Sequence, residues 1–199
     1  MVQREPAVRS KGLAELQAGD HVCFLYKTEE EHRAFLVEYL SGGIQRGEKV
    51  LYVLDSHTAA VLVDYLHGRV NLTLAIAKGQ LRWMQAADAY TPRGRFEPNR
   101  VLELWRKEIE EAREEGFPAL RATGEMGWAR ADVPGAERLV EYESRANDTL
   151  PKMPVVALCQ YPTGLFSTET LRAIRQAHPW VVYGGTVREN PEYLPLSRN

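Results

Sequence analysis

The chain has 199 residues and a formal net charge of −2; 44% of its residues are hydrophobic and 26% are charged. This length and composition are typical of one globular domain and exclude a disordered, collagen-like or disulfide-stapled chain. The balanced charge also argues against a general nucleic-acid binder, so we expect no direct nucleic-acid contact.

Short apolar runs alternate with segments of helical periodicity along the chain. In chain order, strands are predicted at residues 21–26, 49–55, 80–86, 119–125, 155–161 and 180–184, and helices at 28–46, 56–66, 72–77, 98–116, 135–150 and 168–178. Thr28, with Glu31 three residues later, has the pattern of a helix N-cap, and Ser56 is a second cap candidate. Residues 88–99 form the least regular stretch.

Continuously apolar strands that alternate with helices indicate a mainly parallel sheet covered on both faces. The predicted fold class is therefore α/β, a three-layer architecture in a single domain over residues 19–190. A polar leader (1–18) and a Pro-rich tail (191–199) flank it.

Nothing in the sequence indicates export or a membrane anchor. No apolar run approaches the roughly 18–20 residues that span a bilayer, and the amino-terminal sequence lacks the apolar core of a secretory signal. Two cysteines far apart in the chain suit reduced thiols in a cytoplasm. We expect a cytoplasmic protein without membrane contact.

Ligands of open α/β sheets usually bind beyond the carboxyl ends of the strands. These ends gather aromatic, hydrogen-bonding and acidic side chains that suit a small organic ligand better than a polyphosphate. The predicted ligand-binding residues are Tyr26, Asp55, His57, Tyr90, Glu125, Trp128, Gln160 and Tyr161.

The first strand–helix connection argues against a phosphate-binding loop. Such a loop needs glycines, a lysine and a hydroxyl in the pattern GxxxxGK[ST]. Residues 26–31 read YKTEEE, with no glycine and three consecutive carboxylates that would repel a triphosphate. The same carboxylates are favourable at a helix N-terminus for purely structural reasons.

Four blocks of the sequence, GDHVCFLY (19–26), RGEKVLYVLD (46–55), RATGEMGWA (121–129) and LCQY (158–161), resemble the MEDS family. The resemblance extends from about residue 19 to 190. MEDS is a sensory domain named for methanogen and methylotroph regulators, related to KaiC and RecA-like ATPases but without their phosphate loop. The resemblance implies a RecA/KaiC-like fold and a sensor of small hydrocarbon derivatives, with no catalytic residues and no cofactor.

The resemblance leaves the effector of this sensor unspecified. We expect no helix-turn-helix segment in the leader or the tail, so the signal would pass to a regulatory protein partner. An exposed helix or sheet edge would also allow a homodimer.

Several residues admit a second interpretation. His21 and Cys23 face the same side of one strand, and Cys159 on another could join them as a soft metal site or a reactive thiol, although burial as core residues is the commoner role. Glu125 could contact a ligand or hold a loop backbone. Ser56, His57 and an acid could form a hydrolase triad, but this hypothesis is weak because no GxSxG elbow is present.

The favoured prediction is a non-enzymatic sensory domain that binds a small organic molecule. The alternatives are a degenerate nucleotide-binding protein, a redox sensor that uses Cys23 and Cys159, and a scaffold whose pocket is filled by its own side chains.

Overall fold

An eight-stranded sheet with the order β1-β8-β7-β2-β6-β5-β3-β4 forms the centre of the computed structural model, which describes residues 8–130 and 132–195. The strands are β1 (Ser10–Lys11), β2 (His21–Tyr26), β3 (Lys49–Leu54), β4 (Leu81–Gln85), β5 (Leu120–Glu125), β6 (Val155–Pro162), β7 (Trp180–Tyr183) and β8 (Thr186–Glu189). Every neighbouring pair from β7 to β4 is parallel, whereas β8 and β1 add an antiparallel edge.

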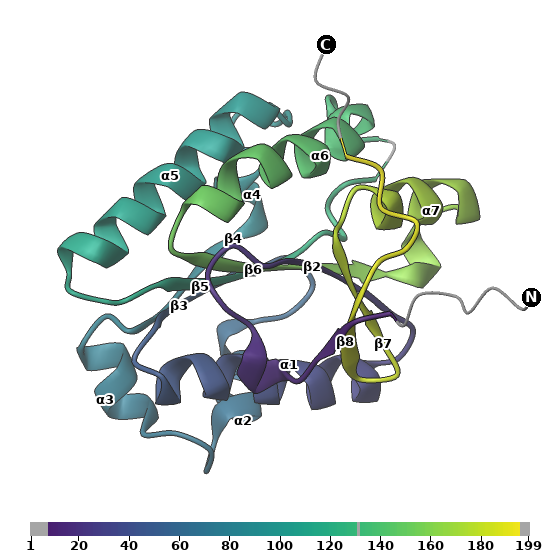
Figure 1. Ribbon diagram of the computed structural model, residues 1–199. Coiled ribbons are helices and arrows are strands. Elements are labelled where there is room, and N and C mark those ends of the chain that lie inside the picture. The colour runs from purple at the N-terminus through teal and green to yellow at the C-terminus, as the bar shows by residue number, and fades with distance from the viewer. Residues whose placement is uncertain (1–7, 131, 196–199) are drawn as a thin grey trace, which may run out of the picture.

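Helices cover both faces of the sheet (Figure 1). One face carries α1 (Glu29–Gln45), α2 (Ala59–Leu66) and α3 (Leu72–Ala77); the other carries α4 (Ala86–Ala89), α5 (Pro98–Glu114), α6 (Leu139–Thr149) and α7 (Thr168–Gln176). We call these the α1 face and the α6 face. The predicted three-layer, mainly parallel α/β architecture is confirmed.

Alternation along each strand divides the core into two apolar clusters. Val22, Phe24 and Leu158 pack toward the α1 face, whereas Cys23 and Ala157 pack toward the α6 face. The central strands β2, β3 and β5 are buried along nearly their whole length, which explains why they read as continuous apolar runs.

Both ends of the described chain add strands that the sequence analysis missed. Tyr183 pairs with Thr186 across Gly184 and Gly185, and both glycines have positive φ, as a two-residue hairpin of the I′ kind requires. Ser10 and Lys11 of the predicted leader pair with β8. Residues 1–7 of the leader and 196–199 of the tail lie outside the described residues.

Two predicted helix caps have different outcomes. The Thr28 hydroxyl accepts a hydrogen bond from the Glu31 amide at 3.2 Å, as predicted. The predicted Ser56 cap is wrong: Thr58 caps α2 through the Val61 amide at 3.4 Å. Ser56 lies two residues upstream of this cap, and its amide and hydroxyl donate to Glu125 instead.

No helix in the described part of the chain combines the length and the apolar character that crossing a membrane would require.

Candidate functional site

The connection between β2 and α1 is only two residues long, Lys27 and Thr28. Glu29, Glu30 and Glu31 follow immediately in the first turn of the helix. A phosphate loop wraps its anion with several glycine amides and a lysine. This connection has neither the length nor the charge pattern of a phosphate loop.

Glu125, at the end of β5, is 1% exposed and serves as the acceptor for the β3–α2 turn. The amides of Asp55, Ser56 and His57 donate to its Oε2 at 3.1, 2.6 and 3.1 Å. The hydroxyls of Ser56 and Tyr52 add bonds at 2.9 and 2.8 Å. The carboxylate is therefore engaged by the protein itself, which favours the loop-holding interpretation of Glu125.

His57 links this carboxylate to the surface. Its Nδ1 lies 2.9 Å from Glu125 Oε1, and its Nε2 lies 3.0 Å from both carboxylate oxygens of Glu29. The hydrogen bond to Glu125 is the main reason that the pKa of His57 rises to about 9, against the opposing effect of burial. Burial would raise the pKa of Glu125, but the hydrogen bond and charge of His57 outweigh it and lower that pKa to about 2.

His32 and Gln160 complete the network on the α1 face. His32 stacks on His57 with ring centroids 4.7 Å apart, and its Nε2 lies 2.5 Å from Gln160 Oε1. The Gln160 amide donates to Thr123 Oγ1 at 2.7 Å. Burial lowers the pKa of His32, and Tyr65 lies 3.3 Å from its other ring nitrogen. All the ring nitrogens of both histidines have partners.

Tyr26 and Asp55, two further predicted ligand residues, flank this network. The Tyr26 ring lies 4.4 Å from the His32 ring and is buried. Asp55 is exposed, and its main-chain amide, rather than its carboxylate, bonds to Glu125.

Tyr90 and Trp128 lie on the other side of the sheet, in the α6-face core. Their rings stack at 4.9 Å, and Trp128 also packs on Phe96 at 4.8 Å. A Cβ on Gly124 would come within 2.1 Å of the Tyr90 hydroxyl, so the glycine makes room for this ring. These two predicted ligand residues therefore belong to an aromatic core.

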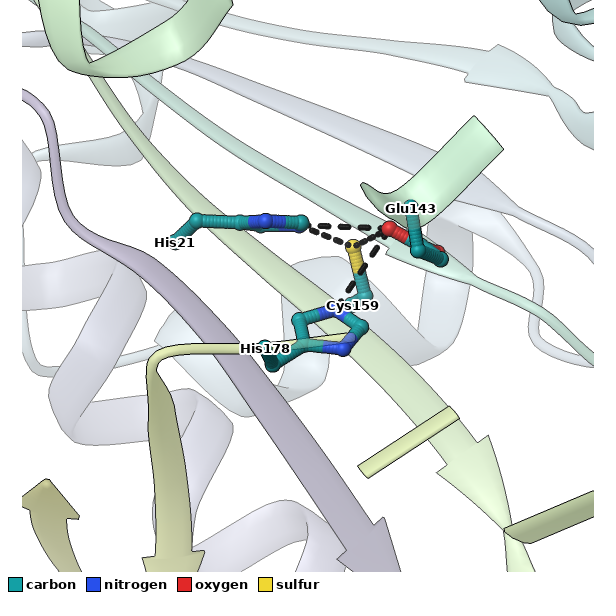
Figure 2. Close-up of side chains that lie close together, drawn as sticks. All are labelled: His21, Glu143, Cys159 and His178. Atoms are coloured by element: carbon teal, nitrogen blue, oxygen red, sulfur yellow. Dashed lines mark hydrogen bonds and ion pairs between the residues drawn. The ribbon is translucent and has the colours of Figure 1, made fainter. Parts of the chain in front are cut away.

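A second polar cluster lies buried on the α6 face. His21, Glu143, Cys159 and His178 come from β2, α6, β6 and the α7–β7 connection, and Figure 2 shows their polar ends pointing toward one another. His21, Glu143 and His178 are at most 1% exposed, and Cys159 is partly buried.

The Glu143 carboxylate occupies the middle of this second cluster. Its Oε2 lies 3.2 Å from His21 Nε2, 3.4 Å from His178 Nε2 and 3.6 Å from Cys159 Sγ. Tyr161, a predicted ligand residue, donates its hydroxyl to the other carboxylate oxygen. Burial would raise the pKa of Glu143, yet His178 and His21 together hold it well below its usual range.

The structure changes the predicted thiol site. His21 and Cys159 do meet, with Nε2 and Sγ 3.3 Å apart. Cys23 pairs in register with Cys159 on the neighbouring strand, but it lies outside the cluster of His21, Glu143, Cys159 and His178. Sequence reasoning missed Glu143, although a carboxylate on the buried stripe of α6 with Leu139 and Ala146 was a visible signal.

A small cavity adjoins this cluster between the sheet and helices α5 and α6. Its volume is about 20 Å³. Its lining is mostly apolar: His21, Trp105, Ala122, Thr123, Gly124, Tyr142, Leu150, Val155, Ala157, Leu158 and Cys159. None of the eight predicted ligand residues is among them. The sheet separates those eight, leaving Tyr26, Asp55, His57, Glu125 and Gln160 around the α1-face network and Tyr90, Trp128 and Tyr161 on the α6 face.

Two solved structures share this architecture, which is that of the RecA/KaiC-like proteins. The flagellar accessory protein FlaH from Methanocaldococcus jannaschii superposes with a TM-score of 0.58 at 13% identity, covering 89% of this chain and 80% of that one. A KaiC-like protein from Pyrococcus horikoshii gives 0.58 at 13% identity, covering 87% and 79%.

Sequence comparison gives the family. The model of MEDS, the methanogen/methylotroph, DcmR sensory domain, matches residues 20–179, and the chain belongs to this family. The transcriptional repressor DcmR of Methylorubrum extorquens is 25% identical over 161 residues, which are 80% of this chain and 58% of the repressor. The chain thus spans less than two-thirds of that relative. Both matches indicate a sensory or regulatory role.

Proposed function

We propose that this chain is a cytoplasmic ligand sensor that binds a small, largely apolar organic molecule and signals to a regulatory protein partner. The observation that carries the proposal is the apolar cavity between the sheet and helices α5 and α6. This location differs from the strand-end ligand site predicted from the sequence, where Glu125, His57 and Gln160 already make hydrogen bonds within the protein.

The cavity selects by size and polarity. About 20 Å³ is available where a single water needs about 10–15 Å³, so the cavity as it stands holds one or two water-sized groups, and a larger guest requires its walls to move. Apolar cavities of this kind stay dry and accept apolar guests. Small hydrocarbon derivatives have the required size and chemistry.

Helices α5 and α6 offer a route for the signal. Trp105 on α5 donates its indole N–H to the Tyr142 hydroxyl on α6 at 2.7 Å, and both residues line the cavity. A guest that binds more tightly to one arrangement of this pair shifts the population toward it. The outer surfaces of α5 and α6 would then present the change to the partner.

Nucleotide sensing is disfavoured by the acidic first turn of α1 and by the bonded carboxylate of Glu125. A Mg–nucleotide would have to displace the turn amides from Glu125 and approach Glu29–Glu31 without a compensating cluster of cations.

Thermal unfolding of the purified chain with small halogenated and methylated compounds tests the proposal. A guest at 100 times its Kd stabilises by about 2.7 kcal/mol, a rise in Tm of about 5–10 °C for a domain of this size. Ala157→Val, which adds two carbons to the cavity wall, should abolish the rise. Val156→Ile, the adjacent residue on the opposite face, should leave it in place.

The proposal is contradicted if no such compound raises Tm, or if Ala157→Val and Val156→Ile respond alike. A comparable rise with Mg–ATP would instead favour a degenerate nucleotide-binding protein.

A further inference from the structure

The α6-face cluster brings together four groups of the kind that bind transition metals: two imidazoles, one thiol and one carboxylate. His21, Glu143, Cys159 and His178 each offer one ligand atom, and these atoms all lie within 4.8 Å of one another. Their convergence from four separate elements is visible in Figure 2.

The outer hydrogen bonds of the cluster fix the protonation of both rings. The side-chain nitrogen of Asn147 donates to the carbonyl oxygens of Glu143 and Ala177. The side-chain oxygen of Asn147 therefore faces His21 Nδ1 at 3.0 Å and accepts a hydrogen bond from the Nδ1–H group. His178 Nδ1 lies 2.8 Å from the Ile174 carbonyl oxygen and must donate to it. These bonds place the ring proton of each neutral histidine on Nδ1, so a neutral ring presents an unprotonated Nε2 to the centre, whereas a protonated ring would donate from Nε2 to Glu143. Outer partners of this kind orient the histidine ligands of metals.

With both rings neutral, the donor that faces Glu143 Oε2 is the Cys159 thiol, at 3.6 Å. Both Nε2 lone pairs face the Glu143 carboxylate, which is itself an acceptor. His178 Nε2 is fully buried and has no hydrogen-bond partner. A single proton on His21 would satisfy one contact and leave His178 unpaired. Unpaired buried polar atoms of this kind are rare and costly.

The spacing of the ligand atoms matches one cation at the centre. Tetrahedral zinc, with bonds of about 2.0–2.3 Å, separates neighbouring nitrogen, oxygen and sulfur ligands by about 3.3–3.6 Å. The four short separations in the cluster are 3.2, 3.3, 3.4 and 3.6 Å.

We propose that His21, Glu143, Cys159 and His178 form a site for one divalent transition ion of the zinc class. Two neutral imidazoles, one carboxylate and one thiolate carry a total charge of −2, which the ion neutralises. The metal forms bonds to two nitrogens, one oxygen and one sulfur, and the thiol proton leaves to solvent. Tyr161, on the second oxygen of Glu143, is a positioning residue.

The histidines of the α1 face do not make a comparable site. His57 bonds Glu125 through one nitrogen and Glu29 through the other, and the nitrogens of His32 contact Gln160 and Tyr65. A metal there would first have to break bonds that the protein already makes. The α6-face cluster loses no comparable contact at His178.

Titration of the chelator-treated full chain with Co²⁺, followed by displacement with Zn²⁺, tests the proposal. We expect saturation at one ion per chain, an intense visible spectrum of tetrahedral cobalt and a thiolate-to-metal charge-transfer band. Cys159→Ser should remove that band and weaken zinc binding by more than about 100-fold, beyond the about 10–100-fold cost of losing an outer partner.

Cys23→Ala is the matched control, because Cys23 lies beside Cys159 on the next strand and outside the ligand set. It should keep the band. The chain has two cysteines, so Cys23→Ala assigns the sulfur even if Cys159→Ser fails to fold. The proposal is overturned if folded wild-type chain binds neither ion saturably, or if the band disappears with Cys23→Ala.

Discussion

On the α1 face of the sheet, a buried carboxylate at Glu125 is surrounded by donors: three main-chain amides, two hydroxyls and the ring of His57. On the α6 face, the buried carboxylate of Glu143 receives one tyrosine hydroxyl and otherwise meets a thiol and two imidazole nitrogens, one of them unpaired. Both carboxylates have lowered pKa values, and both are held beside histidines.

The difference concerns what each cluster still lacks. The ring nitrogens and the carboxylate of the α1-face network all have partners, and the network holds the β3–α2 turn against the end of β5. The α6-face cluster leaves His178 Nε2 without a hydrogen-bond partner, and it adjoins an apolar cavity. Residue type alone does not distinguish the two; the number of available donors does.

The largest effect should come from the complete network. Glu125→Gln removes the charge that anchors the turn and places an amide donor among donors, so we expect a loss of about 3–5 kcal/mol in the free energy of unfolding. Urea denaturation measures it. Glu38→Gln, which breaks an exposed ion pair with Arg69, should cost at most about 1 kcal/mol. Equal losses would show that Glu125 does not hold the turn.

The pH dependence of stability should report His57. Its folded pKa of about 9 exceeds an unfolded value near 6.5, so its contribution is fully present below pH 6.5 and disappears as the pH rises through 9. Over that window a shift of this size corresponds to at most about 3 kcal/mol, which solvent screening of the partly exposed ring reduces; it includes the effect of His57 on Glu125, which is counted once. His57→Gln should flatten the curve between pH 6.5 and 9. An unchanged slope in the variant would assign the pH dependence to groups other than His57.

Removing one tyrosine hydroxyl from each face sharpens the comparison. Tyr161→Phe takes the hydroxyl donor from Glu143, and in metal-free protein we expect a loss of about 2 kcal/mol. Tyr52→Phe takes one of several donors from Glu125, and we expect a smaller loss in the free energy of unfolding, about 1 kcal/mol. Chemical denaturation of both variants in the presence of a chelator shows which of them loses more stability. The reverse order would contradict the account of the two carboxylates.

The smallest effect tests the corrected helix cap. Thr58→Ala removes the oxygen that accepts from the Val61 amide and should cost about 1 kcal/mol. Thr73→Ala, at an exposed position inside α3, should be neutral or slightly stabilising because alanine is the better helix former. A neutral Thr58→Ala would mean that Glu125 alone fixes the start of α2.

Much of the fold could be predicted because the central strands are buried on both faces and therefore read as unbroken apolar runs. The antiparallel edge was missed although Gly184-Gly185 is a recognised hairpin signal, and a two-residue strand at Ser10 has no periodicity to detect. Short, polar edge strands are defined by their partner rather than by their own sequence.

The site was harder to predict because it depends on which side chains share a face. Strand alternation put His21 and Cys23 on one face, with Cys159 as a possible neighbour from another strand; in the structure Cys159, but not Cys23, joins His21 in the cluster. Glu143 and His178 come from a helix and a connection that the sequence could not position. Asp55 and Glu125 were expected to meet at the sheet edge, but the turn presents its amides, not its carboxylate, to Glu125. A one-residue step between Gln160 and Tyr161 put two predicted neighbours on opposite faces.

The most direct test of the contrast between the faces is the zinc stoichiometry of the purified, folded chain, measured by native mass spectrometry for wild type, His178→Gln and His57→Gln. The account predicts one zinc ion in wild type and in His57→Gln, and none in His178→Gln. Wild-type chain that stays zinc-free in zinc-supplemented buffer, or zinc lost with His57→Gln and kept with His178→Gln, would contradict it.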